Sequence, residues 1–219
     1  MIWDNEFAIS ILPRLLSGLW LTVQATCAGT ALALVLGLTL ALAARSPFRA
    51  VRMSSRGITE LFRRTPLLIH VYLLFFALPE LGISLPPLLA GIIALGLHTG
   101  SYMTAVYQSS IDAVPVGQWE AAKSLGYSNF DKWTRVILPQ AVPIMLPGLG
   151  NYALLMFKES AILSVIAVPE AMQSALSIGG RTYRYFEAVT IVGILYLLVS
   201  FPVAVGLRLL ERRVAVSRQ

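Results

Sequence analysis

The fold is decided by residues 15–44, LLSGLWLTVQATCAGTALALVLGLTLALAA, a run of 30 residues without a charged side chain. A helix that crosses the hydrocarbon core of a bilayer needs about 20 mainly apolar residues. Outward from this run, four further windows also lack charge, at 65–79, 81–111, 136–157 and 188–207. All but the 65–79 window are long enough to span a membrane alone. We therefore expect an integral membrane protein.

The number of spans depends on the 65–79 window, which holds only 15 residues. Extending it back through Ile58, Leu61 and Phe62 gives about the length that a membrane span needs. We therefore predict an all-α fold with about five transmembrane helices, forming a single transmembrane domain over residues 1–219. The helices are expected at about 16–44, 57–79, 87–113, 143–168 and 187–210.

The composition supports this prediction. Hydrophobic residues make up 57% of the chain and charged residues 13%, whereas soluble globular domains carry about 25% charged residues. This balance excludes an ordinary soluble enzyme and a disordered protein. The formal net charge of +6 would suggest nucleic acid binding in a soluble protein. No nucleic acid partner is expected here, because the positive charge is explained by membrane topology.

Lysine and arginine indicate the orientation, because they concentrate in the cytoplasmic loops of membrane proteins. One side of the predicted topology carries 13 of them, the opposite side carries 3, and Lys158 lies within a span. This asymmetry predicts an outward-facing N-terminus and a cytoplasmic C-terminus. The 13 residues on the cytoplasmic side are Arg45, Arg49, Arg52, Arg56, Arg63, Arg64, Lys123, Lys132, Arg135, Arg208, Arg212, Arg213 and Arg218.

Small residues recur every four positions in two of the predicted spans. Faces of this kind allow helix backbones to approach closely in lipid. We favour packing within the subunit over a contact between subunits. The residues are Gly29, Ala33, Gly37 and Ala41 in the first span, and Gly96 and Gly100 in the third.

The loop at about 114–142 is too long for a simple connector. Pro115 to Leu125 is predicted to form a short helix, and Gly126 stands where a left-handed cap would end it. Ser128 and Asp131 form a capping-box-like pair that would start a second helix. Two amphipathic helices on the cytoplasmic face would lie on lipid headgroups or bind a soluble partner, and the composition does not decide. Further on, Pro139, Pro143 and Pro147 are expected to break the helix.

The loop carries a resemblance to a known family. Glu120-Ala121-Ala122, then Gly126, then Val136-Ile137-Leu138-Pro139 matches the EAA motif of ABC importer permeases over about 20 residues. Other stretches are similar to the polar-amino-acid branch of that family, and Ile2 to Pro13 is similar to permeases of the ectoine and hydroxyectoine type. These other stretches are Leu21-Thr22-Val23, Phe62 to Leu68, Val114 to Gln118 and Leu146 to Asn151.

The resemblance implies a type I ABC importer (MetI-like) permease fold in the bacterial cytoplasmic (inner) membrane. It implies that the EAA segment is a coupling helix that rests in a groove of a cytoplasmic ATPase. Because the sequence has no phosphate-binding loop of the G-x-x-x-x-G-K-[ST] kind, ATP and Mg²⁺ are expected on that partner, and no cofactor is expected on this chain. The implied ATPase-coupling residues are Glu120, Ala121, Ala122, Gly126, Leu138 and Pro139.

The family also implies further partners. They are a second permease subunit, identical or homologous, and an extracytoplasmic solute-binding protein that delivers a small polar solute. The solute class would be polar amino acids or amino-acid-like compatible solutes. Arg181, Tyr183 and Arg184, in the outer loop before the last span, are expected either to be solvated or to form a docking edge for the binding protein.

Polar side chains inside the predicted spans are candidates for the substrate pathway, because an ionisable group in the membrane usually faces a cavity or a partner charge. Lys158 and Glu159 are adjacent and so point in different directions. The resemblance implies that the stretch from Lys158 to Ile166 lies near the solute. The candidate pathway residues are Lys158, Glu159, Ser160, Ser164, His98 and Tyr102.

The sequence departs from the family pattern at two positions of the third predicted span. Family members often have Glu and Arg where this chain has Ala105 and Gln108. The loss of that charge pair suggests a neutral or zwitterionic solute, or recognition by the partner permease.

Two other classes of function compete with a transporter subunit. An intramembrane enzyme would need a nucleophile–base pair or a metal cluster, but Cys27, His70 and His98 fall on different predicted helices. The sequence also lacks the H-E-x-x-H and G-x-S-x-G motifs. A stand-alone channel would not require the EAA spacing. We therefore expect a transporter subunit that is not an enzyme and holds no metal.

Overall fold

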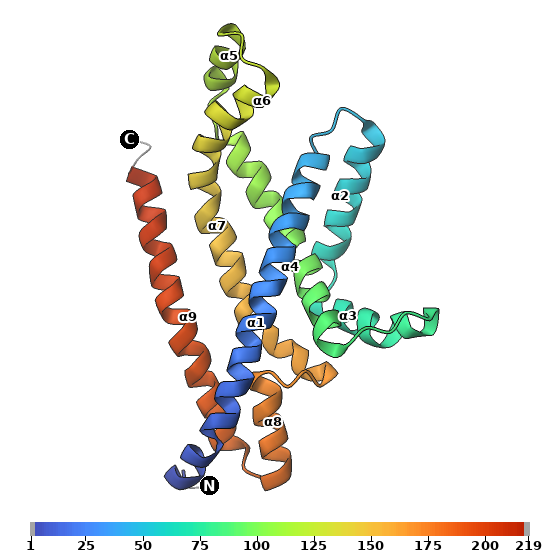
Figure 1. The fold of residues 1–219 in the computed structure, drawn as a ribbon, viewed down its shortest axis with the longest axis vertical. Coiled ribbons are helices and arrows are strands. Elements are labelled where there is room, and N and C mark those ends of the chain that lie inside the picture. The colour runs from blue at the N-terminus through green and yellow to red at the C-terminus, as the bar shows by residue number, and fades with distance from the viewer. Residues whose placement is uncertain (1–2, 217–219) are drawn as a thin grey trace.

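The computed structural model describes residues 3–216, and this part of the chain is an elongated helical bundle without strands (Figure 1). Two short π-helical turns and two 3₁₀ turns, named by their residues below, interrupt the helices. The helices are α1 (Asn5–Ala43), α2 (Arg49–Arg64), α3 (Leu67–Tyr72), α4 (Pro87–Asp112), α5 (Val116–Ser124), α6 (Asn129–Asp131), α7 (Leu138–Glu159), α8 (Ala171–Thr182) and α9 (Tyr185–Val216).

The small-residue faces form the seam between α1 and α4, which confirms that they serve packing within the subunit. A Cβ atom added to Gly37 would lie 2.9 Å from the carbonyl oxygen of Gly100. One added to Gly100 would lie 3.1 Å from the carbonyl oxygen of Ala33. The two backbones are thus in direct contact, as small-residue packing in lipid requires.

The helix expected as one span over 57–79 is broken, and this corrects the prediction. α2 ends at Arg64, α3 begins at Leu67, and the two segments are bent by 103°. Pro66 has no backbone N–H and pushes the residue before it into extended geometry. Thr65 accordingly has φ −105° and ψ 139°. After α3 the chain passes through the π turn Leu73–Ala77 and the 3₁₀ turn Leu78–Leu81.

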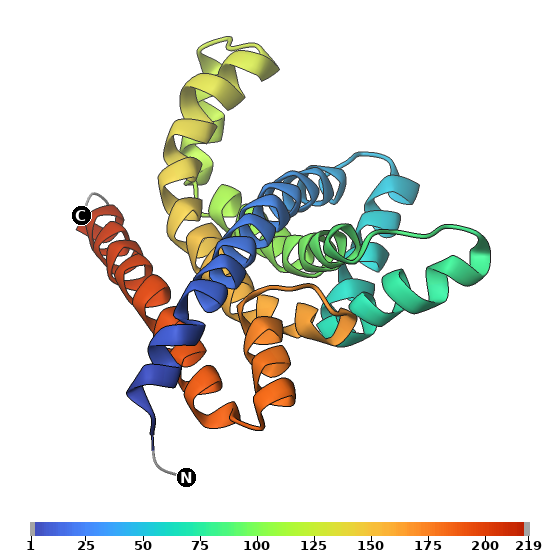
Figure 2. The ribbon, with the colours of Figure 1, turned by 60° about the horizontal axis from the view of Figure 1, so that its bottom comes forward.

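The number of spans agrees with the expectation of about five. Among the described helices, α1, α4, the run Asn129–Ile166 and Tyr185–Arg213 are long and apolar enough to cross a membrane. The bent pair of α2 with Leu67–Leu81 qualifies as a fifth span when its two parts are taken together. α9 lies at the edge of the bundle (Figure 2), and only 11% of its most apolar window is buried. Most of α9 therefore faces lipid or another subunit.

The expected break at the prolines before the fourth span is wrong. The helical run continues from the π turn Lys132–Ile137 into α7, with Pro143 and Pro147 inside the helix. In the π turn, the N–H of Leu138 donates to the carbonyl of Trp133, five residues earlier. Such local adjustments let membrane helices tolerate proline. α7 then ends at Glu159, earlier than the expected 168, and the 3₁₀ turn Ser160–Ile166 follows.

Candidate coupling surface and solute pathway

The EAA segment forms the protruding tip of the molecule at the end where α4 finishes and α7 begins (Figure 1). Gly126 has φ +72° and closes α5 with a pair of hydrogen bonds. Its N–H donates to Lys123, and the Tyr127 N–H donates to Ala122, at 3.1 Å each. This is a Schellman cap, and it confirms the sequence prediction for this turn. The Ser128 hydroxyl likewise accepts from the Asp131 N–H at 3.1 Å.

The tip exposes apolar side chains to an unusual degree. Val116, Leu125 and Phe130 are 70%, 72% and 76% exposed. Glu120 and Ala121 are also exposed, whereas Ala122 is buried against the rest of the tip. Leu138 and Pro139 are exposed at the start of α7. An apolar patch of this kind marks an interaction site.

The tip is firmly joined to the base of α7. The rings of Trp119 and Trp133 meet edge to face with centroids 5.2 Å apart. Gln140 Nε2 donates to Gln118 Oε1 at 3.2 Å. A displacement of α5 would therefore be passed to α7 through packed side chains.

The candidates at the end of α7 fall into different environments. Ser160 is fully buried and donates to the carbonyl of Phe157 at 2.7 Å. Lys158 is exposed, while Glu159 and Ser164 are half-buried. Neither Lys158 nor Glu159 makes an ion pair within the part of the chain that the structure describes. Ser160 is thus enclosed, and Glu159 keeps an accessible carboxylate.

His98 and Tyr102 lie on one face of α4 and belong to a row of rings. His98 stands 5.2 Å from Tyr102 and 5.3 Å from His70, measured between ring centroids. The Tyr102 ring stacks on Tyr152 of α7 at 5.7 Å. His70 is buried and its Nε2 lies 3.0 Å from Thr65 Oγ1. The row connects the break after α2 with the middle of α4 and α7.

Arg63 lies elsewhere than the predicted topology indicates. The topology places it in a loop, but it lies in the last turn of α2 beside the middle of α4. The hydroxyl of Tyr102 donates to its carbonyl oxygen at 3.1 Å, and its guanidinium lies 5.3 Å from the centre of the Tyr102 ring. The short 65–79 window and Pro66 were the available signals that the span is discontinuous.

A buried carboxylate near the opposite end was also missed. Glu170 is fully buried and caps α8 by accepting from the N–H groups of Met172 and Gln173 at 2.9 and 2.7 Å. The hydroxyls of Thr22 and Tyr196 lie 3.3 and 3.1 Å from its Oε2. Burial raises the pKa of the Glu170 carboxyl, and these hydrogen bonds oppose that rise. The carboxylate joins α1, α8 and α9, which only the tertiary fold brings together.

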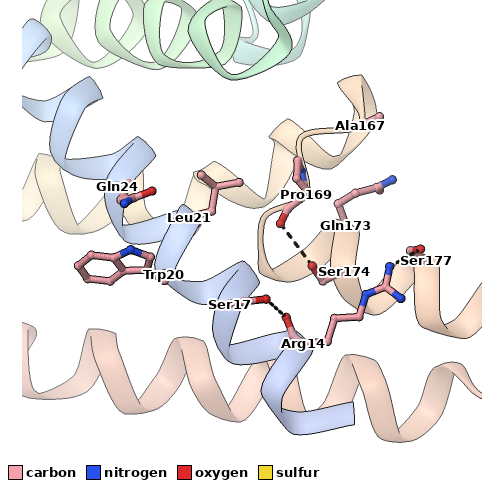
Figure 3. A pocket seen from close by; sticks show the side chains of 10 residues that line it. All are labelled: Arg14, Ser17, Trp20, Leu21, Gln24, Ala167, Pro169, Gln173, Ser174 and Ser177. Carbon is pink, nitrogen blue, oxygen red and sulfur yellow. Dashed lines mark hydrogen bonds between the residues drawn. The ribbon is translucent and has the colours of Figure 1, made fainter.

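A polar cavity of about 470 Å³ opens beside this network, between α1 and α8 (Figure 3). Arg14 crosses it to donate to the Ser177 hydroxyl at 3.0 Å. Gln24 and Gln173 contribute amide groups from the two helices. The cavity therefore offers both donors and acceptors at the end of the molecule opposite to the coupling tip.

The loop before α9, expected to be either solvated or a docking edge, has one of its three residues engaged within the subunit. Arg184 bonds to Asp4 at 3.0 Å and to the buried Glu187 at 2.7 Å, and its guanidinium covers the Phe7 ring. The N–H of Phe7 and this guanidinium hold the pKa of the Asp4 carboxyl below its ordinary range. Arg184 thus ties the start of α1 to α9, while Arg181 and Tyr183 remain exposed.

Membrane spans, a discontinuous helix with polar side chains beside it, and a protruding apolar tip are the features of a membrane transport subunit. The chain belongs to the family of binding-protein-dependent transport system inner membrane components, whose family model matches residues 11–216. It is thus an ABC transporter permease subunit and not an enzyme, so neither the intramembrane enzyme nor the stand-alone channel applies.

Named relatives cover nearly the whole chain. A probable amino-acid ABC transporter permease of Sinorhizobium fredii is 40% identical over 95% of this chain and 93% of its own length. A putative glutamine transport permease of Rickettsia bellii is 33% identical over 97% and 99%. An L-cystine transport permease of Bacillus subtilis is 33% identical over 94% and 90%.

Solved structures agree on the fold. An amino acid ABC transporter crystallised with histidines matches with a TM-score of 0.91 at 34% identity, covering 97% of this chain and all of that one. An inward-facing methionine ABC transporter matches with a TM-score of 0.78 at 19% identity, over 94% of this chain and 98% of that one. The predicted MetI-like permease fold is confirmed.

Proposed function

We propose that this chain is the membrane-spanning subunit of an ATP-driven, binding-protein-dependent importer of a polar amino acid or an amino-acid-like compatible solute. The exposed apolar tip around Glu120 carries the proposal, because it needs a cytoplasmic partner to cover it. The relatives named above, which are amino-acid, glutamine and L-cystine permeases, support the solute class. An ectoine-type solute is the variant suggested by the N-terminal stretch.

The tip would act as the coupling helix. Glu120 would accept charge-assisted hydrogen bonds from an ATPase subunit, and Ala121 would allow its surface to come close. Gly126 fixes the turn, and Leu138 and Pro139 extend the contact at the base of α7. ATP and Mg²⁺ would bind to the partner. Closure of the ATPase pair would move α5, and the contact between Trp119 and Trp133 would carry that movement into α7.

The solute pathway would run along the ends of α7 and the face of α4. Glu159 is the accessible acceptor for a solute ammonium group, with Lys158 and Ser164 beside it. Tyr102 and His98 would line the opposite wall, while Ser160 would shape the turn from within. A second permease subunit would complete the pathway, since the poorly buried α9 and the half-buried pathway residues leave it open on one side.

The coupling tip would lie in the cytoplasm and the cavity between α1 and α8 on the outer side, as the distribution of arginine and lysine predicts. The N-terminus would then face outward and the C-terminus the cytoplasm. A binding protein would deliver its solute at the outer end, where Arg181 and Tyr183 are exposed.

The test is uptake by cells or proteoliposomes that contain this chain with its ATPase and binding protein. The labelled solutes would be glutamine, glutamate, histidine, arginine and ectoine, and the control would omit this chain. ATP-dependent uptake of one solute that requires the chain is the expected result. An assembled complex that carries none of them would contradict the proposed solute class.

A further inference from the structure

A cavity of about 270 Å³ lies between α2 and α4 and contains charged side chains from one face of α2. Arg56, Glu60 and Arg63 line it from α2, at positions four and three residues apart that share a helix face. Ala105 and Gln108 line it from α4. The pathway candidates described above do not include these residues.

Arg63, at one end of this cavity, lies beside the middle of α4, a helix long and apolar enough to cross a membrane. Tyr102, which contacts Arg63, stands ten residues before Asp112, the end of α4. At about 1.5 Å per residue, this places Arg63 about 15 Å from the end of the helix. A charged group at that depth is costly in lipid and faces a cavity or a partner charge.

The charges in the cavity do not cancel. Glu60 bonds to Arg64 at 2.6 Å, and its closest approach to Arg63 is 3.9 Å. Arg56 makes no ion pair with any residue between 3 and 216. Arg63 therefore has one long ion pair and a ring contact, and its remaining N–H donors have no carboxylate partner in the described chain.

Ala105 makes room for a ligand opposite these guanidinium groups. Its side chain ends at Cβ, and the residue is exposed to the cavity between the two helices. Gln108 adds an uncharged amide one turn further along the same face of α4. The cavity is thus lined by two arginine side chains, by Glu60, which already bonds to Arg64, and by uncharged side chains of α4.

We propose that this cavity binds the carboxylate of the transported amino acid, with Arg63 as its main contact and Arg56 beside it. This site rests on the proposed function, because it assumes that the transported solute is an amino acid whose carboxylate enters the cavity between α2 and α4. A guanidinium matches a carboxylate with two parallel hydrogen bonds. Solutes without a free carboxylate lose this contact.

The test is binding of labelled solute to the purified nucleotide-free complex, measured by equilibrium dialysis without the binding protein. The probes are L-glutamine, L-histidine and L-arginine, each paired with its α-amide. We expect Arg63→Gln to weaken binding of the acid about tenfold or more, as loss of a charged hydrogen-bond pair does. Binding of the α-amide should be weak and nearly the same in the wild type and in Arg63→Gln.

A second variant keeps the test independent of any folding defect at position 63. Ala105→Glu places a carboxylate in the cavity and should weaken binding of the acid while leaving the arginines in place. Arg49→Gln, on the same helix but outside the cavity, is the matched control and should bind like the wild type. Elution of each complex as one assembled species shows that the variants fold.

The outcomes separate this inference from the proposed function. Wild-type uptake of an amino acid tests the proposed function, and the comparison of variants tests the site. If the wild type transports and Arg63→Gln and Ala105→Glu both bind the acid with unchanged affinity, the carboxylate site is wrong. Equal affinity of the wild type for acid and amide would also overturn it. A wild type that neither transports nor binds any probe contradicts the proposed function and the site together.

Discussion

The two ends of this permease subunit use polar and apolar side chains in opposite ways. At the proposed outer end, Arg184 bonds to both Asp4 and Glu187, and Glu170 collects donors from four residues. At the proposed coupling end, Phe130 and Leu125 are more than 70% exposed. The proposed outer end is stabilised by contacts within the subunit, whereas the apolar tip would be covered by a surface from another protein. Substitutions should therefore reduce stability at one end and coupling at the other.

The largest effect is expected from Glu170→Ala. The substitution leaves two backbone N–H groups and the Tyr196 hydroxyl without their buried acceptor, whereas the Thr22 hydroxyl keeps the Gly18 carbonyl. Each unsatisfied group is costly. We expect a loss of about 3 kcal/mol in the free energy of unfolding. Thermal or denaturant unfolding of the purified subunit in detergent would measure it. Glu80→Ala, at an exposed position, is the control, and equal stability of the two variants would contradict the role of this network.

Glu120→Lys should act at the other end and on function alone. It reverses the charge that we place against the ATPase, so uptake should fall about tenfold or more. The unfolding midpoint should stay close to that of the wild type, because Glu120 is exposed. Glu6→Lys, the same reversal at an exposed outer position, should transport normally. Normal transport by Glu120→Lys would show that the tip does not couple through this residue.

Gly126→Ala tests whether the shape of the tip matters apart from its charge. No atom lies within 4 Å of an added Cβ, so the cost arises only from the left-handed backbone at φ +72°. A cost of about 1–2 kcal/mol is expected in α5 and its cap. Hydrogen exchange of the amides in 116–131 should therefore speed up. Gly117→Ala, which also meets open space but has no positive φ, should leave exchange unchanged or slower.

The smallest effect concerns acid stability at the outer end. The pKa of Asp4 is lowered in the folded state from its ordinary value of 3.8. Its contribution to stability is therefore fully present above that value and is lost as the pH falls through the folded pKa. Asp4→Asn should therefore make the free energy of unfolding depend less on pH in this acidic range, measured by denaturant unfolding at a series of pH values. A profile that is unchanged below pH 4 would show that the bond from Arg184 to Asp4 does not matter to stability.

The sequence predicted the parts of the molecule that depend on local patterns. Charge-free length identified the spans, and Gly126 with Ser128 identified both ends of the tip's helices. The spacing of small residues in 29–41 and 96–100 predicted close packing within the subunit, because such faces let helix backbones approach closely in lipid. The family and its fold were likewise confirmed.

The remainder required three-dimensional information. A charge count treats Arg63 as a loop residue, and only the fold shows α2 lying against the middle of α4. Arg184 looked free because its partner Asp4 is 180 residues away. Local rules predicted breaks at the three prolines because they do not include adjustments such as the π turn before Pro139, and Pro143 and Pro147 lie inside α7. The assignments of Glu120 and Glu159 to coupling and transport stay predictions.

The seam between α1 and α4 has a consequence for how such permeases diversify. An added methyl group at Gly100 would meet the carbonyl oxygen of Ala33, and one at Gly96 would meet the Leu32 side chain, so this edge of α4 leaves little room for substitution. The other edge, with Ala105 and Gln108, borders a cavity and leaves room for larger side chains. One helix thus has a closely packed edge and an open edge. Substitutions on the open edge can change what the cavity accepts without disturbing the packing of the scaffold.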